Sequence, residues 1–283
     1  MSDVGPIGEV WYERAGRCST QTLLLKVLFT EQPLSIQVHP DDVYAQSMGQ
    51  SRGKTEAWYV LSAREYSKVA LGLIHPVTKH QLRQAITDGS IMDLVAWKNV
   101  AAGDVIVVPA GTIHALGAGL VIAEIQQRSD TTFRLFDYGR PRELHIDSAL
   151  AVAELGPASD QAPPCRLSDA RTLLAVNRYF TLERIELSAN CSWPLESELE
   201  TWLLVLNGNA KVGCFDVGVG EAIFIQSHCV EITAGSTGMS CLVAFGNGAP
   251  ASEGVQPDFG NAIAVPLGMG TSTVARRFRS RPV

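Results

Sequence analysis

Apolar and polar positions along the first half of the chain follow the spacing of β-strands in most places. After Thr78 the apolar period lengthens to that of a helix, with Thr78 as a cap and Gly89 as its end. Further helices are expected over Ile91–Ala96 and Ile146–Leu155, and a polar turn at Asp41-Asp42. The expected strands are Leu23–Phe29, Leu34–His39, Glu56–Leu61, Val69–Ile74, Val105–Val108, Leu120–Ile125 and Phe133–Phe136.

A segment rich in Pro, Ala and Ser, residues 156–165, predicts a linker between two domains. The 283 residues are enough for two domains of ordinary size. We expect a first domain over 1–155, with a helical insert near 76–97, and a second over 166–283.

Short apolar runs separated by Gly-rich turns predict a second β-barrel or sandwich after the linker. These runs are Tyr179–Leu187, Thr201–Leu206, Ala222–Ile225 and Cys241–Phe245. They carry no set of ligand residues, so we expect a structural role. From about residue 246 the chain is rich in Gly, Pro and Ser and is expected to be irregular, with the basic cluster Arg276–Arg281 as a solvated tail.

Composition narrows the classes of partner. Lys and Arg number 23 and Asp and Glu 29, so the net charge is 23 − 29 = −6, without a basic stripe for nucleic acid. No run approaches the roughly 18 apolar residues of a membrane span, and the N-terminus lacks a signal-peptide pattern. The six cysteines are scattered without C-x-x-C pairs, which predicts reduced, mostly buried thiols in a cytoplasmic protein.

Four side chains suited to a metal ion recur in order: Gln37, His39, Glu56 and His114. Gln37 and His39 are two apart, so on a strand both project from the same face. Glu56 opens another predicted strand, and His114 follows a Pro/Gly turn. Two imidazoles, one carboxylate and one amide oxygen suit Zn²⁺, with room left for substrate or water.

Each of these residues also has an ordinary structural interpretation. A single histidine beside a strand is more often hydrogen-bonded within the fold than a ligand, and Glu56 beside Lys54 is typical of a surface ion pair. Only His39 and His114 stand at strand ends beside Pro and Gly, where barrel mouths are built. The remaining histidines lack such a setting: His75, His80, His145 and His228.

The spacing Gly103-x5-Pro109-x-Gly111-x2-His114 matches the second cupin motif, whereas the first motif is altered to Gln-x-His, with Glu56 at 56 − 39 = 17 residues after His39. Together with the segments 34–42, 53–59 and 125–140, this pattern resembles the type I mannose-6-phosphate isomerases, short bacterial form. The resemblance is close over roughly 7–155 and holds only in outline beyond. It implies an all-β-dominated fold of two cupin-like jelly-roll β-barrels.

The resemblance further implies one zinc ion per chain and interconversion of mannose 6-phosphate and fructose 6-phosphate through an enediol. It assigns Gln37, His39, Glu56 and His114 as zinc ligands, Arg134 as the essential arginine, Lys54, Glu124 and Asp130 to ring opening and proton transfer, and Ser35 and Arg140 to the phosphate. Lys54 is either a neutral base or a phosphate anchor, and Asp130 either an ionised base or a buried partner of a zinc-bound histidine.

Two other functions stay open at this stage. One is an isomerase of another aldose, phosphorylated or free, because the family usually begins with a further Trp-Gly-Gly segment and its longer members have lysine where Arg140 stands. The other is a non-catalytic, sugar-sensing cupin that has kept its metal site. An iron oxygenase is disfavoured, because such sites use two histidines and a carboxylate with open positions. Nothing in the sequence indicates an oligomeric state.

Overall fold

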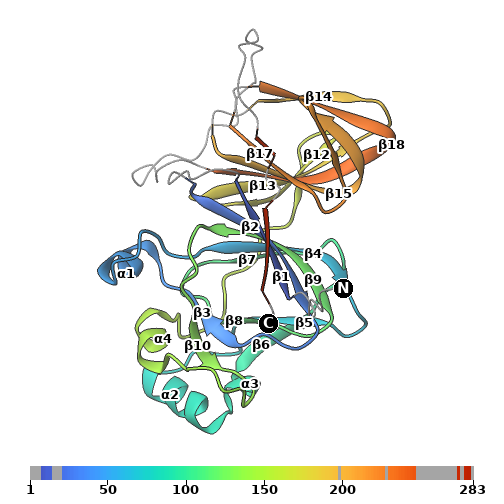
Figure 1. Ribbon diagram of the computed structural model, residues 1–283. Coiled ribbons are helices and arrows are strands. Elements are labelled where there is room, and N and C mark those ends of the chain that lie inside the picture. The colour runs from blue at the N-terminus through green and yellow to red at the C-terminus, as the bar shows by residue number, and fades with distance from the viewer. Residues whose placement is uncertain are drawn as a thin grey trace, which may run out of the picture. The chain divides into compact units, whose positions relative to one another are not determined.

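The computed structural model describes residues 8–14, 21–196, 199–226, 229–246, 273–274 and 277–281. β-Strands dominate these residues (Figure 1), which confirms the predicted all-β class. The chain divides into two compact units, each built from more than one segment: 1–11, 24–162 and 278–283 form the first, and 12–23 and 163–277 the second. Among the described helices, none has the length and apolar character needed to cross a membrane.

Two antiparallel sheets build the first unit. The six-stranded sheet has the order β20 (Arg277–Arg281), β1 (Glu9–Glu13), β2 (Leu23–Thr30), β9 (Leu120–Gln127), β4 (Glu56–Ala63) and β7 (Val105–Val108). The five-stranded sheet has the order β10 (Phe133–Phe136), β3 (Ile36–Val38), β8 (His114–Leu116), β5 (Lys68–Leu73) and β6 (Val95–Asn99).

The five-stranded sheet has one apolar face and one face with polar side chains. Its apolar face belongs to a core that includes Ile36, Val38, Ala115, Phe133 and Leu135. Because side chains alternate along a strand, the intervening residues Gln37, His114 and Arg134 project from the opposite face. Gln37 is the direct cross-strand neighbour of both His114 and Arg134, so the three form a row across β10, β3 and β8.

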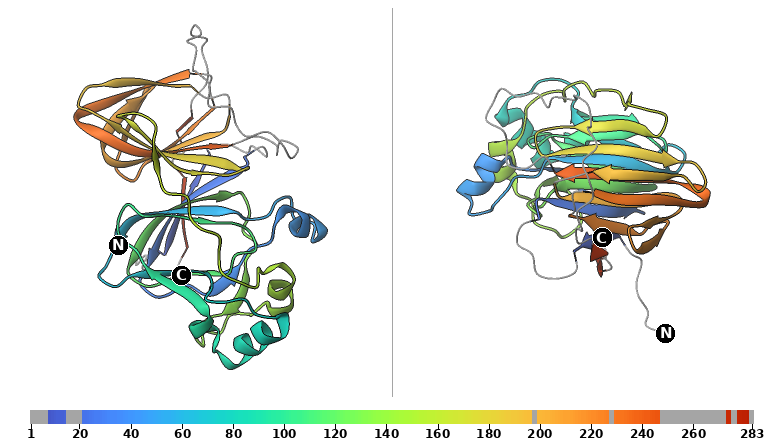
Figure 2. Two further views of the ribbon diagram at one scale, coloured as in Figure 1. Left: turned by 180° about the vertical axis from the view of Figure 1, so that it is seen from behind. Right: turned by 90° about the horizontal axis from the view of Figure 1, so that it is seen from above.

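Helices cover the apolar face of this sheet. Helices α2 (Lys79–Asp88), α3 (Ile91–Leu94) and α4 (Ile146–Val152) gather beside β3, β8 and β10 (Figures 1 and 2). Helix α2 confirms its prediction, since Thr78 forms a capping box with Gln81 and Gly89 ends the helix at φ 82°. Its buried residues Leu82, Ala85 and Ile86 join the core of the sheet.

Two helix predictions and one turn prediction need correction. Helix α3 ends at Leu94, because the residues that follow pair with β5 as β6. Helix α4 ends at Val152, because the Glu154 N–H leaves the helical pattern and donates to the Gly111 carbonyl. The expected polar turn is instead a short helix, α1 (Asp42–Ser47), whose N-cap Asp41 accepts a hydrogen bond from the backbone of Tyr44.

The second unit is a nine-stranded sheet. Its strands are β11 (Cys165–Arg166), β12 (Arg171–Val176), β13 (Phe180–Leu187), β14 (Ser192–Glu196), β15 (Thr201–Val212), β16 (Phe215–Gly218), β17 (Ala222–Ile225), β18 (Cys229–Gly246) and β19 (Thr273–Val274). The long strand β18 pairs with β14 over its first part and with β13 over its last, and β15 follows both parts with register shifts between them. One apolar cluster forms the core, including Leu203, Val205, Ile223, Ile232 and Val243.

Two further predictions are corrected in the described part of the chain. The segment 277–281 is not a solvated tail, because it pairs with β1 as strand β20, and β19 pairs with β17. The rest of the predicted irregular segment lies outside the described residues. Of the described cysteines, Cys165, Cys191 and Cys214 are exposed, at an edge strand and in turns, and only Cys241 is buried. Cys18 lies outside the described residues.

We expect Gly53→Ala to destabilise the protein. A Cβ at this position would lie 2.5 Å from both the Asp41 carbonyl carbon and the Pro40 carbonyl oxygen. These are backbone atoms of the segment after His39, which the Lys54 N–H holds through the Pro40 carbonyl at 3.0 Å. Overpacking of this kind costs about 1–3 kcal/mol, which a lowered midpoint of thermal unfolding will show. The control Gly218→Ala meets only a carboxylate oxygen at 4.0 Å, and an equal midpoint for both variants would contradict the prediction.

Candidate metal centre and active cavity

Three of the predicted ligands meet in the interior of the first unit. His39 directly follows β3, Glu56 begins β4 and His114 begins β8. Their ligand atoms lie within 4.8 Å of one another, and each residue is 1% exposed. The two carboxylate oxygens of Glu56 face different histidines, each at 3.4 Å from an Nε2 atom. The two sheets therefore contribute to one compact cluster.

Backbone carbonyls fix the tautomers of both histidines. Nδ1 of His39 lies 2.9 Å from the Thr131 carbonyl, and Nδ1 of His114 lies 2.9 Å from the Thr112 carbonyl. Because a carbonyl only accepts, each Nδ1 carries the proton and each Nε2 presents a lone pair toward Glu56. Nε2 of His39 and both Glu56 oxygens make no hydrogen bond in the described structure. Buried acceptors that face one another fit a cation between them.

The electrostatics keep these residues in the form that binds metal. Burial and the charge of Lys54 lower the pKa of His39 to about 3, and burial also lowers the pKa of His114. Burial alone would raise the pKa of Glu56, but Lys54 and the histidines outweigh it and lower that pKa. Neutral imidazoles and an ionised carboxylate are thus present at neutral pH, as metal ligation requires.

Gln37 stands beside the cluster as a fourth candidate ligand. Its Nε2 lies 3.3 Å from Nε2 of His114, and its Oε1 accepts a hydrogen bond from the Ser35 hydroxyl at 3.0 Å. A half-turn of the amide exchanges its oxygen and nitrogen, and Ser35 can then accept instead of donate. The donor set of Gln37, His39, Glu56 and His114 therefore fits a divalent cation such as Zn²⁺.

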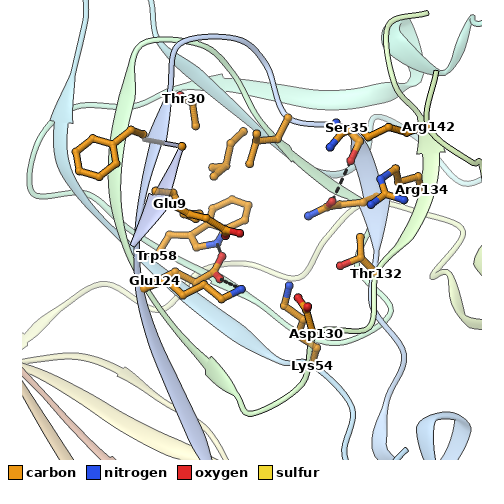
Figure 3. Close-up of a pocket in the computed structure, with 17 residues that line it drawn as sticks. Glu9, Thr30, Ser35, Lys54, Trp58, Glu124, Asp130, Thr132, Arg134 and Arg142 are labelled. Carbon is orange, nitrogen blue, oxygen red and sulfur yellow. Dashed lines mark hydrogen bonds and ion pairs between the residues drawn. The ribbon is translucent and has the colours of Figure 1, made fainter. Parts of the chain in front are cut away.

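A cavity of about 170 Å³ adjoins the cluster between the two sheets (Figure 3). Its lining is unusually rich in charge, with Glu9, Lys26, Lys54, Glu124, Asp130, Arg134 and Arg142. Of the residues that the sequence assigned to the site, six lie on it: Ser35, Gln37, Lys54, Glu124, Asp130 and Arg134. Figure 3 shows Ser35, Arg134 and Arg142 on one side and Glu9, Trp58 and Glu124 on the other.

Sequence reasoning missed the buried Lys26 in this cavity. Its ammonium lies 3.6 Å from Glu124 Oε1 and 4.3 Å from the centre of the Trp11 ring. The other Glu124 oxygen accepts a hydrogen bond from Trp58 Nε1 at 3.1 Å. A single lysine within the apolar run Leu23–Phe29 was the available indication, since a strand buried on both faces rarely carries one.

The pKa of Glu124 is shifted in the direction opposite to that of Glu56, and the pKa of the neighbouring Lys54 is shifted as well. Burial and the negative charge of Glu56 raise the pKa of Glu124, although Lys26 and Lys54 partly oppose the rise. Burial would lower the pKa of Lys54, but Glu56, Glu124 and Asp130 outweigh it and the pKa is raised. The protein groups around Lys54 therefore favour its ammonium form.

Asp130 and Arg140 have surroundings that differ from those expected from the sequence. Asp130 is exposed, and the Thr131 carbonyl rather than this carboxylate orients His39, so the interpretation of Asp130 as a buried histidine partner is wrong. Arg140 does not line the cavity, because its guanidinium is bonded to Asp137 and to the Pro33 carbonyl. Arg142, which the sequence analysis did not select, lines it instead.

Comparisons with known proteins point to one family. The chain is 34% identical over 232 residues to a probable mannose-6-phosphate isomerase, GmuF, of Bacillus subtilis, covering 76% of this chain and 72% of the relative. It is 36% identical over 199 residues to a mannose-6-phosphate isomerase of Streptococcus mutans, 65% of this chain and 62% of that protein's length. No family model matches the chain.

Solved structures agree with this result. The crystal structure of mannose 6-phosphate isomerase from Bacillus subtilis superposes with a TM-score of 0.70 at 26% identity, covering 81% of this chain and 76% of that one. A putative mannosephosphate isomerase from Archaeoglobus fulgidus gives a TM-score of 0.63 at 17% identity, covering 81% of this chain and 73% of that one. The latter likeness supports the fold alone.

We expect His114→Ala to lose bound metal. Removing one imidazole leaves the buried Glu56 carboxylate with fewer ligand partners around the ion, so metal content per chain after dialysis will fall strongly from that of the wild type. His75→Ala is the matched control, because His75 is exposed, lies outside the cluster and has its Nδ1 3.1 Å from the Pro76 carbonyl. Elemental analysis of both variants checks the prediction, and equal metal contents would contradict it.

Proposed function

Because the chain belongs to the mannose-6-phosphate isomerase family, we propose that it interconverts mannose 6-phosphate and fructose 6-phosphate. The observation that supports this activity most strongly is the buried His39–Glu56–His114 cluster beside a cavity with Arg134 and Lys54 on its wall. A phosphorylated sugar is the substrate class that suits such a cavity, because it brings negative charge to its cationic side chains.

One zinc ion per chain is part of this proposal. Gln37, His39, Glu56 and His114 would hold the ion, and zinc at this position would polarise sugar oxygens as a Lewis acid. The local support is the set of facing acceptors described above: Nε2 of His39 and both Glu56 oxygens make no hydrogen bond in the described structure, and the Lys54 ammonium approaches only Glu56 Oε2, at 3.5 Å.

We assign proton transfer between the two sugar carbons to Glu124. Aldose–ketose isomerisation removes a proton from C2 and returns one to C1 through an enediol, so the carrier must be a base in one step and an acid in the next. Glu124 is buried on the cavity wall, and its raised pKa brings it closer to neutral pH. Lys26 and Trp58 hold its two oxygens in place.

The cations of the cavity stabilise the negative charge that develops on the enediol oxygens. Arg134 is fixed on β10 beside Gln37, and its Nε makes no hydrogen bond in the part of the chain that the structure describes. Lys54 stays protonated and donates to the sugar oxygens during ring opening, with Asp130 as the carboxylate beside it. Fixed charges of this kind act without reorganisation in the reacting state.

The domain organisation is proposed on the same basis. Residues 1–155 would form the catalytic cupin domain, 156–165 the linker and 166–283 a second cupin-like barrel with a structural role, apart from β20, which pairs with β1 in a sheet of the first unit. In support, every described residue of the metal cluster and the cavity lies in the first unit, between its two sheets. The second unit has a large apolar core, and no described group of His, Cys, Asp and Glu with metal-ligand spacing lies in it.

A coupled assay of the purified protein tests the activity directly. We expect turnover of mannose 6-phosphate that EDTA abolishes and added Zn²⁺ restores. Zinc-loaded protein that fails to turn over mannose 6-phosphate contradicts the proposal. Free mannose used with equal kcat/KM would instead favour an isomerase of unphosphorylated aldoses, and ligand-induced thermal stabilisation without product a sugar sensor.

We expect Glu124→Gln to lower kcat by roughly 10²–10⁴-fold, because an amide cannot carry the proton, while metal content stays at the wild-type value. Exchange of the C2 proton with deuterated water should fall in parallel. Glu183→Gln is a matched control, since Glu183 is equally buried and ion-paired, with Arg171, but lies in the second unit. Wild-type exchange in Glu124→Gln, with loss of exchange in Lys54→Met, would transfer the role to Lys54.

A further inference from the structure

We propose that Arg142, rather than Arg140, binds the phosphate group of the substrate and sets the preference for a phosphorylated sugar. This inference rests on the proposed function and deepens it. The family resemblance directed attention to Arg140, but the two arginines, two positions apart, have different surroundings in the structure.

The guanidinium of Arg140 is already used within the protein. Its Nη2 donates to the Pro33 carbonyl at 2.9 Å and to Asp137 Oδ1 at 2.6 Å, and its Nε donates to the same carboxylate oxygen at 3.1 Å. It does not line the cavity and lies over the Tyr138 ring. Arg140 therefore acts as a brace that ties the loop after β10 to the chain segment just before Ser35.

Arg142 has the geometry of an anchored guanidinium with donors left for a ligand. Its Nε donates to Asp137 Oδ2 at 2.6 Å and its Nη2 to Asp137 Oδ1 at 2.8 Å, a two-point grip by a carboxylate that is 3% exposed. The described structure shows no hydrogen bond to its Nη1. Because the grip uses one edge of the planar group, the other edge remains available to an anion.

The charge on this side of the cavity also fits a phosphate. Asp137 neutralises only one of its two arginine partners, so this group carries one net positive charge. Arg134 adds a second positive charge on the same side, next to Ser35 (Figure 3). A sugar phosphate carries about −1.5 to −2 charges at pH 7, which matches this sum.

The opposite side of the cavity lacks such an excess. Lys26 is paired there with Glu124, and Glu9 adds a further negative charge (Figure 3). A phosphate on that side would meet carboxylates. The distribution of charge thus sets one orientation for the substrate, with its phosphate at Arg142 and its reacting carbons toward Lys54 and Glu124.

The test compares Arg142→Ala with Arg140→Ala. We expect Arg142→Ala to raise KM for mannose 6-phosphate and the inhibition constant of inorganic phosphate roughly 10–100-fold, the loss of hydrogen bonds to a charged group, with a smaller change in kcat. Arg140→Ala should change both constants far less. Arg142→Lys keeps the charge but loses the two-point grip, so its constants should lie between those of the wild type and Arg142→Ala.

Calorimetric titration with inorganic phosphate separates this inference from the proposed function. Should the wild type bind phosphate and Arg142→Ala bind it weakly while mannose 6-phosphate is not turned over, the function fails and the phosphate site stands. Should wild type and Arg142→Ala share the same KM and phosphate affinity, or Arg140→Ala show the larger loss, the site is overturned. Arg142→Gln replaces Arg142→Ala if thermal unfolding shows that the alanine variant is not folded.

Discussion

The interior of the first unit is organised around the buried Glu56 carboxylate, which faces the Nε2 atoms of two histidines and has the Lys54 ammonium 3.5 Å from its Oε2. Two imidazole lone pairs face a carboxylate that accepts no hydrogen bond, and all three residues are buried. The carbonyls of Thr131 and Thr112 enforce this by taking the proton-bearing nitrogen of each ring. Such an arrangement is stable when a cation joins the acceptors, so the backbone around the site is shaped for an ion.

The strand period explains how a small fold can supply this site and a core together. Side chains alternate between the two faces of the sheet along β10, β3 and β8. Phe133, Ile36 and Ala115 therefore pack against the helices, whereas Arg134, Gln37 and His114 face the interior. The inner face of the six-stranded sheet changes character along β4 and β9. Glu56 and Glu124 make one end polar, and Val60 and Ile122 belong to an apolar cluster at the other end.

Sequence alone could predict features that local chemistry dictates. The cap Thr78, the end at Gly89 and the meeting of His39 with Glu56 and His114 follow from spacing and turn residues. It could not predict features that depend on tertiary pairing. Strand β6 forms because β5 offers an edge, and Lys26 is buried because Glu124 and Trp11 receive it. Asp137 binds both nearby arginines, and the Pro33 carbonyl takes a further donor of Arg140 but not of Arg142.

Glu56 and Glu124 show how one interior gives the same side chain two roles. Glu56 has Lys54 and two histidines around it, and its pKa is lowered, so it remains an anion suited to a metal ion. Glu124 lies beyond that anion, and the charge of Glu56 adds to burial in raising its pKa. Two nearby carboxyl groups whose pKa values are shifted in opposite directions suit different tasks, one the binding of a cation and the other acid–base work. Lys26 and Lys54 oppose this rise, so the two lysines and Glu56 act in opposite directions on the pKa of Glu124.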